Sequence, residues 1–151
     1  MQEPRSASEF PHNRFWAVLE ERHPQERGRR VMRMAFFWQR GLPELQLVIT
    51  MYVAPDKNGC GVFLGRNERL GAAGVHERMR PYATRLVAAL GLDPSLSSAE
   101  FPFVSRWQVN CFAEDNWPAM ADWLVTEASR FERVLRTILA TQPADVSEAG
   151  P

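Results

Sequence analysis

The chain contains little cysteine and little histidine, and both shortages narrow the chemistry that it can carry. Its 151 residues include two cysteines and three histidines. Cys60 and Cys111 lie far apart with no histidine at ligand spacing, so they fit reduced thiols better than a disulfide framework or a zinc site. A single disulfide between them stays open. His12, His23 and His76 have no partner motif, so we interpret them as solvent-exposed or helix-end residues and not as general bases.

Targeting signals and long apolar runs are also missing. The opening residues, MQEPRSASEF, are charged and lack an apolar stretch, so we expect neither a secretory signal nor a transit peptide. The longest apolar stretch, Leu47 to Ala54, is interrupted by Thr50 and is much shorter than the roughly 20 residues of a membrane helix. We therefore expect a soluble, cytoplasmic protein with no membrane partner.

Motifs for phosphate, metal or cofactor chemistry are absent as well. Neither Gly59-Cys60-Gly61 nor the glycines of 71–74 have the Lys-Ser/Thr ending of a P-loop or the spacing of a dinucleotide loop. The nearest approach to a nuclease-like cluster is Asp56-Lys57, but the following Asn58-Gly59 predicts a hairpin turn. Glu114-Asp115 precedes an expected helix and is interpreted as its cap. We expect no cofactor, no metal and no catalytic residue.

Apolar and aromatic side chains, in contrast, are plentiful. They make up 45% and 11% of the chain, with five tryptophans, which is enough apolar surface to offset the entropy of one ordered domain. We place this domain at residues 10–140. The ends, residues 1–9 and 141–151, are rich in Ala, Ser, Glu and Pro and are expected to be flexible.

The hydrophobic pattern predicts an α+β fold. Turn residues separate the first three expected strands: Gly41 and Pro43 precede the second, and Asn58-Gly59 precedes the third. Pro81 lies within the helical stripe that ends at Gly91, so we expect a kink there or a helix that begins near it. We expect an antiparallel sheet of about four strands covered by helices. The expected elements are a helix over Phe10–Arg22, strands over Val31–Gln39, Glu44–Ala54 and Cys60–Arg66, a helix within Asn67–Gly91, a strand over Phe103–Phe112 whose buried face is ambiguous, and a long helix from Asp115 or Asn116 to Ile138.

Charge is unevenly distributed although the formal net charge is zero. Residues 22–85 contain 12 basic and 5 acidic residues, whereas residues 100–151 contain 4 basic and 8 acidic ones. This asymmetry favours one electropositive and one electronegative face, provided that the two segments are not interleaved in space.

The most informative polar feature is a run of arginines interleaved with aromatic residues. Such a run can contact phosphates while an aromatic side chain stacks on a base. Arginine and tryptophan are also enriched where proteins bind each other. The alternative, which we favour, is a solvated connector whose arginines pair with Glu20, Glu21 and Glu26 while the aromatics fill the core. The candidate nucleic-acid or partner-binding residues are Arg27, Arg29, Arg30, Arg33, Arg40 and Trp38, with a second cluster at Arg66, Arg69, Arg78, Arg80 and Arg85.

Scattered aromatic positions give the chain a resemblance to a known family. Phe15-Trp16, the strand Leu47 to Val53, Trp107 and Trp123-Leu124 resemble a bacterial family of uncharacterised function, over about residues 10 to 140. Members of that family are small α+β domains often appended to nuclease-like domains in restriction or defence proteins. The resemblance implies an accessory role and carries over no catalytic residue.

Three functional hypotheses follow. The first is a noncatalytic binding module that engages a protein partner, as an accessory component of a bacterial defence or mobile-element system. The second is nucleic-acid binding through Arg27, Arg29, Arg30 and Arg33. The third and least supported is a small enzyme, such as a nuclease, that uses Asp56, Glu114 or a histidine. Assembly into a homo-oligomer stays open.

Overall fold

The computed structural model describes residues 6–65 and 72–141 of the chain. Within them lie five strands and four α-helices, with short 3-10 helices between them. The strands are β1 (Arg30–Arg33), β2 (Phe37–Leu42), β3 (Leu47–Ala54), β4 (Gly59–Gly65) and β5 (Ser105–Gln108), and the helices are α1 (His12–Arg22), α2 (Ala72–Met79), α3 (Ala83–Leu90) and α4 (Trp117–Leu139).

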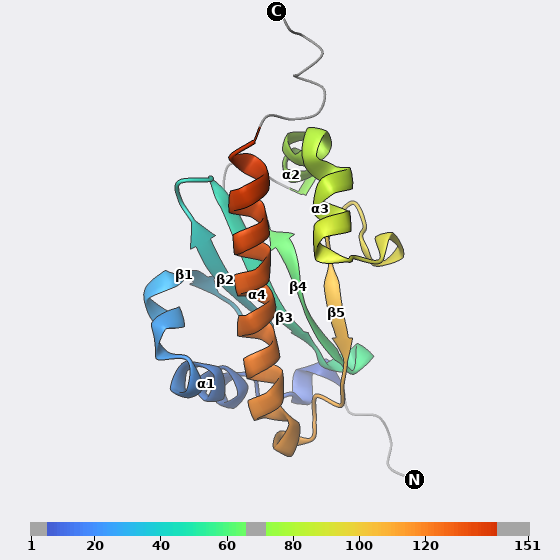
Figure 1. Cartoon of the computed structure of the whole chain (residues 1–151). Helices are drawn as coiled ribbons and strands as arrows, with labels where there is room; N and C mark the ends of the chain where they lie inside the picture. The colour runs from blue at the N-terminus through green and yellow to red at the C-terminus, as the bar shows by residue number, and fades with distance from the viewer. Residues whose placement is uncertain (1–5, 66–71, 142–151) are drawn as a thin grey trace, which may run out of the picture.

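All five strands join one antiparallel sheet in the order β1-β2-β3-β4-β5, so every strand lies beside its neighbour in the sequence. The predicted α+β fold with an antiparallel sheet is confirmed, although the sheet has five strands where we expected about four. The helices α2 and α3 join β4 to β5, and Figure 1 shows α4 crossing in front of the sheet, with α1 near its lower end and α3 near its upper end.

The additional strand arises because the expected strand Val31–Gln39 is two strands. Met34 and Phe37 exchange backbone hydrogen bonds of 2.8 and 3.4 Å, which closes a tight turn between β1 and β2. This turn contains no glycine or proline, so residue preferences do not predict it. Gly41, which we expected in the next turn, lies inside β2, and the chain reverses at Pro43 to Gln46 instead.

Proline and glycine do divide the helical segment as expected. A 3-10 turn over Arg80–Tyr82, with Pro81 inside it, separates α2 from α3, because proline cannot donate the backbone hydrogen bond of a continuous helix. Gly91 ends α3 in the left-handed conformation, at φ 63°. The beginning of the predicted helix, residues 67–71, lies outside the described residues.

The fourth expected strand is shorter than predicted. Phe103 has φ 54°, which is incompatible with a strand, and β5 therefore begins at Ser105 and ends at Gln108. The structure shows which face of β5 is toward α4. Trp107 lies 5.9 Å from Trp123 of α4, between the ring centroids, whereas Arg106 points to the opposite side of the sheet.

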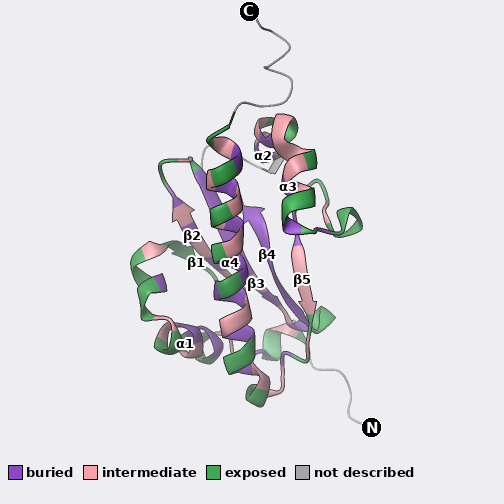
Figure 2. Cartoon of the chain, in the orientation of Figure 1, coloured by how far each residue is buried: buried purple, intermediate pink, exposed green. Residues whose placement is uncertain are grey.

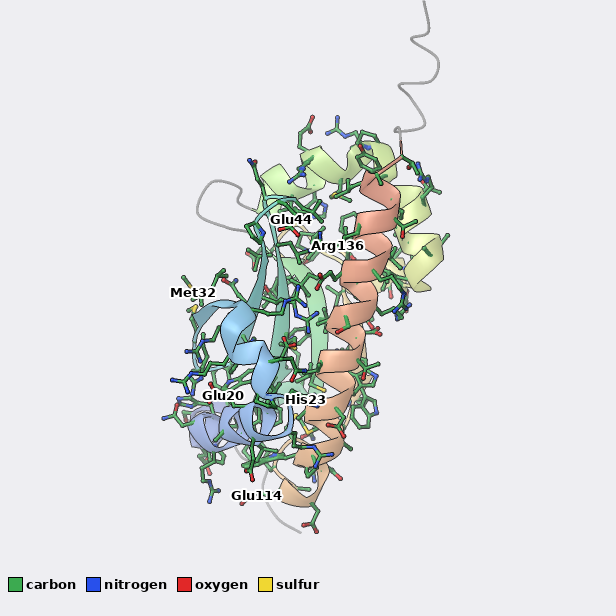
Figure 3. The ribbon with its side chains drawn as sticks, turned by 60° about the vertical axis from the view of Figure 1, so that its left-hand side comes forward. Glu20, His23, Met32, Glu44, Glu114 and Arg136 are labelled. Atoms are coloured by element: carbon green, nitrogen blue, oxygen red, sulfur yellow. The ribbon has the colours of Figure 1, made fainter. Side chains whose placement is uncertain are left out.

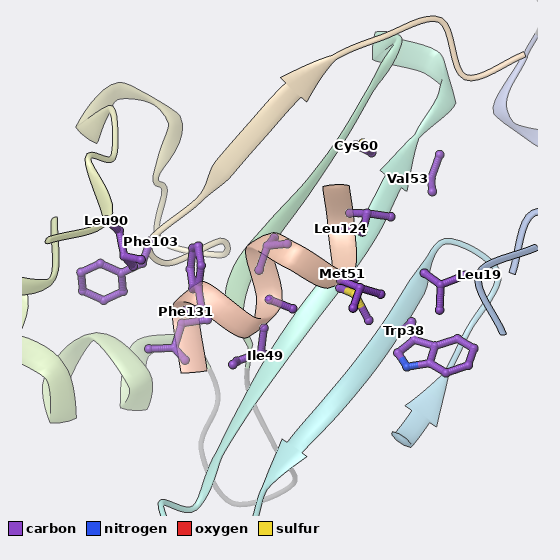
Figure 4. Packing of buried hydrophobic residues seen from close by; sticks show 14 of the residues in the cluster. Leu19, Trp38, Ile49, Met51, Val53, Cys60, Leu90, Phe103, Leu124 and Phe131 are labelled. Atoms are coloured by element: carbon purple, nitrogen blue, oxygen red, sulfur yellow. The ribbon is translucent and has the colours of Figure 1, made fainter. Parts of the chain in front are cut away.

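The hydrophobic core lies between the sheet and the helices. Alternate residues of β2, β3 and β4 point toward α4, and Figure 4 shows Ile49 and Met51 packed near Leu124 and Phe131. Apolar residues recur every three or four positions along α4, so one face of this helix is buried while the other is exposed (Figure 2). The long helix predicted from that spacing is confirmed.

Of the two ends that were expected to be flexible, residues 1–5 and 142–151 lie outside the described residues. Ala7–Glu9 forms a single 3-10 turn, and the Glu9 carboxylate accepts a hydrogen bond from the Ser6 backbone N–H at its start. No helix among the described residues is both long and apolar enough to cross a membrane.

Candidate functional site

Two of the predicted binding residues lie inside the fold. Arg40 and Trp38 both have 0% exposure. The Arg40 guanidinium donates to both carboxylate oxygens of Glu26, at 2.9 and 2.8 Å, and to Glu132 at 3.2 Å. Trp38 packs against Trp16, and the Arg30 guanidinium lies over its ring, 5.0 Å from the centroid. Neither Arg40 nor Trp38 is on a surface that a partner can reach in this conformation.

The other four predicted arginines are near the surface and already have partners in the chain. Arg27 and Arg30 pair with Glu20, at 3.9 and 3.6 Å, and Arg29 pairs with Glu132 at 2.5 Å. Partial burial favours the neutral form of Glu132, but hydrogen bonds from Arg29 and Arg136 hold its pKa below the ordinary value.

Arg33 donates to the Asn13 side chain at 2.5 Å, and so also bonds within the chain. In the second arginine cluster, Arg66 and Arg69 lie outside the described residues, and Arg80 pairs with Glu77 within the same segment. The arginine-rich stretch is thus largely neutralised by the chain's own acids.

Histidines and acids do not converge on a reacting centre in the described part of the chain. His23 contacts Asp122 at 2.7 Å, a pairing that the sequence concealed because 99 residues separate the two. Arg22 binds the same carboxylate with two hydrogen bonds and is the larger reason why the pKa of Asp122 falls to about 2. No serine, threonine or cysteine is among the hydrogen-bond partners of His23 within the described residues.

The described residues do not support a metal site or a reactive thiol either. Within residues 6–65 and 72–141 no group of three or more His, Cys, Asp or Glu side chains is placed to hold a metal ion. Cys60 and Cys111 are free and buried. Burial raises the pKa of both thiols, that of Cys111 to about 11, so neither is an activated nucleophile.

A better candidate for a binding surface is the side of the sheet that faces away from α4, here called the open face. No α-helix in the described part of the chain packs on it. Register places Phe37 of β2, Tyr52 of β3, Gly61 of β4 and Arg106 of β5 in one row across this face. In Figure 3, Met32 of β1 likewise projects away from α4.

Glycines keep the open face shallow, because neighbouring side chains lie flat over them. A Cβ added at Gly41 would come within 2.4 Å of Val31 Cγ1, and one at Gly65 within 2.2 Å of Thr50 Oγ1. At Gly61 the obstruction would be the Tyr52 hydroxyl, at 2.5 Å. Larger residues at these glycines would therefore push the covering side chains away from the sheet.

An aromatic row crosses the open face beside these glycines. Phe63 lies at its centre, with ring-centroid distances of 6.3 Å to Phe37, 5.7 Å to Tyr52 and 5.3 Å to Phe101. Phe101 comes from the loop between α3 and β5, so the row joins segments that are distant in the sequence. The spacings match those at which aromatic pairs attract each other.

The row borders a hollow of about 360 Å³, here called the open-face hollow. This volume lies at the lower end of the range for sites that hold small molecules or side chains. Its apolar walls include residues from three strands and from the α3–β5 loop. Six of its lining residues are Phe37, Tyr52, Phe63, Leu96, Phe101 and Arg106.

None of the six was among the residues predicted to bind. One signal was available in the sequence, since β3, apart from Thr50, and β4 lack polar residues and do not alternate, which is typical of strands covered on both faces. Here helices cover one face alone.

Comparison of the chain with models of protein families, with curated proteins and with solved structures finds no match.

Proposed function

We propose that the chain is a binding module that engages an extended segment of a protein partner through the open face of its sheet. One observation carries the proposal. The large apolar side chains that are exposed in the described part of the chain all belong to this face or its rim. They are Val31, Met32, Met34, Leu96 and Phe101.

Exposed apolar residues that are scattered singly need no explanation, whereas a gathered patch marks an interaction surface. Val31 and Met32 lie at one side of the open face, and Leu96 and Phe101 line the open-face hollow at the other. Met34 lies in the turn between β1 and β2, next to Phe37. The exposed apolar side chains therefore lie at both sides of the open face and at the turn between β1 and β2.

An extended segment of another protein fits this face better than a second copy of the chain. Filling a hollow requires a protruding apolar group. The exposed large apolar side chains of the described residues lie on the same face as the hollow, so a second copy would reach the hollow only with its own open face. A partner segment supplies side chains that project into the hollow.

Nucleic-acid binding through Arg27, Arg29, Arg30 and Arg33 stays a prediction that the geometry does not favour, because three of these arginines pair with Glu20 or Glu132 and the fourth bonds to Asn13. A role in a bacterial defence or mobile-element system rests on the family resemblance alone and stays a prediction as well.

Photo-crosslinking from the open face tests the proposal in the organism that encodes the chain. A benzoylphenylalanine replaces Phe101 in one variant, Met32 in a second, and Arg133, an exposed residue of α4, in a control. We expect one protein to be crosslinked from the first two positions and not from Arg133.

The captured protein is then purified, and its affinity is measured by calorimetry. Phe101→Ser should weaken binding roughly thirtyfold, as loss of an aromatic anchor does, whereas Arg133→Ala should leave it unchanged. Crosslinks to a second copy or to nucleic acid alone, equal crosslinking from Arg133, or unchanged affinity of Phe101→Ser would each refute the proposal.

A further inference from the structure

The open-face hollow has two hydrogen-bond donors beside its apolar walls. The Tyr52 hydroxyl makes none of the hydrogen bonds found among the described residues. Burial raises the pKa of Tyr52 to about 12, so the hydroxyl stays protonated at neutral pH. Arg106 donates through Nη2 to the Lys57 carbonyl at 3.1 Å and takes part in none of the ion pairs of the described residues. Its guanidinium has further N–H groups to offer a ligand.

Gly61 lies between the residues that carry these two donors, while the Arg106 guanidinium extends to the neighbouring Gly59, where an added Cβ would lie 3.0 Å from its Nε. Tyr52 pairs with Gly61 across β3 and β4, and Gly61 pairs with Arg106 across β4 and β5. A Cβ at Gly61 would lie 2.5 Å from the Tyr52 hydroxyl and 2.5 Å from the Ser105 carbonyl oxygen. The tyrosine side chain therefore lies across the glycine toward Arg106, and only a residue without a side chain permits this.

Charge around the hollow favours an anion. Its described lining contains two cations, Lys57 and Arg106, and one carboxylate, Asp56. The positive excess complements a ligand that carries one negative charge next to its apolar part. A carboxylate accepts hydrogen bonds from a phenol and from a guanidinium, and bonds to charged groups are shorter and stronger than those between neutral groups.

We propose that the open-face hollow holds an apolar side chain of the partner segment, and that Tyr52 and Arg106 bind an acidic side chain next to it. The inference rests on the proposed function and adds the chemistry of the segment. Phe63 and Phe101 contact the apolar group, while the Tyr52 hydroxyl and the Arg106 guanidinium donate to the carboxylate.

The carboxylate belongs to a side chain and not to a chain end, because the hollow extends beyond the two donors in both directions. Phe63 and Phe101 lie on one side of the row that contains Tyr52 and Arg106. Pro55 and Lys57 line the hollow on the other side. A segment that fills the hollow passes the donors instead of ending at them.

Titration of the isotopically labelled full chain with short peptides, followed by NMR, tests this inference. The probes are acetyl-Leu-Phe-Glu-Leu-amide, the same peptide with Gln in place of Glu, and the Gln peptide with a free C-terminal carboxylate. At millimolar peptide we expect shifts at Gly61, Tyr52 and Phe101, and affinity for the Glu peptide about fivefold higher than for the Gln peptide.

Two substitutions should remove this preference, because they should weaken binding of the Glu peptide more than binding of the Gln peptide. Arg106→Gln removes the cation, and Tyr52→Phe removes the hydroxyl but keeps the ring. Arg133→Gln and Tyr82→Phe are the matched controls and should keep the preference. The amide spectrum of each variant establishes that it is folded.

Several results would overturn the inference. If the Glu and Gln peptides bind equally, or if the preference for Glu survives Arg106→Gln, then Tyr52 and Arg106 do not bind the carboxylate as proposed. If the peptide with the free C-terminal carboxylate binds most tightly, the donors bind a C-terminus and not an acidic side chain. If no peptide shifts the resonances of the open face, the hollow does not bind an apolar and acidic segment. Photo-crosslinking from Phe101 tests the proposed function independently of this result.

Discussion

Replacing Arg40 should strongly lower the stability of the protein, because its charge network is buried. Arg40→Met keeps most of the side-chain volume but leaves Glu26, only 2% exposed, without its bidentate partner. Removing one partner of such a pair costs about 3–5 kcal/mol, which is a large fraction of the roughly 5–15 kcal/mol that stabilises a domain. We expect the free energy of unfolding to fall by that amount.

Urea denaturation followed by tryptophan fluorescence measures this loss. The double variant Arg40→Met with Glu26→Leu removes both charges, and should recover most of the stability since no unpaired charge remains buried. Arg33→Met is the matched control. Arg33 is half-buried and bonds to Asn13, so we expect a loss of no more than about 1 kcal/mol. An Arg40→Met variant within about 1 kcal/mol of the parent, or a double variant no more stable than the single one, would refute the reasoning.

Two further predictions concern ionisation. Asp122→Asn should lower stability at neutral pH by about 0.2–1 kcal/mol, the range for exposed ion pairs. Because Arg22 and His23 lower the pKa of Asp122 to about 2, the contribution is complete above the unfolded value of about 3.9 and is lost as the pH falls toward 2, where parent and variant should denature alike. A difference between them that persists unchanged at pH 2 would contradict this assignment. Cys60 and Cys111, buried and with raised pKa values, should react with a thiol reagent at neutral pH far more slowly in the folded protein than in denaturant. Rapid labelling of either thiol without unfolding would show that its surroundings open.

Local sequence signals were sufficient for the elements whose structure depends on their own residues. The spacing of apolar residues located α4, Pro81 located the break between α2 and α3, and Asn58 takes the left-handed conformation that the hairpin turn required, at φ 46°. Each depends on a preference that is expressed within a few residues.

The division of one expected strand into β1 and β2 was missed for a physical reason. The turn at Met34 to Phe37 is closed by backbone hydrogen bonds between residues that favour extended structure, and it carries none of the residues that usually mark a reversal. What holds the turn is the pairing of both strands in the sheet, which residues outside the segment determine.

The candidate site was also beyond the reach of local patterns. Tyr52, Phe63, Phe101 and Arg106 come together through strand register and through a loop that returns after two helices. In contrast, the arginines that attracted attention in the sequence are paired with acids, and Glu132 is about a hundred residues from Arg29. Clustering along the chain therefore gave a poor guide to clustering in space.

The position of α4 has a consequence for synthesis of the protein on the ribosome. This helix, Trp117–Leu139, covers the inner face of β3 and β4, yet the strands precede it by more than fifty residues. While the chain emerges, α4 cannot bury the inner face of the sheet until translation has passed residue 139. The residues concerned include Ile49, Met51 and Leu64. A messenger that is truncated before that point would give a product whose inner sheet face lacks α4, and exposed apolar surface of this kind makes a chain prone to aggregate.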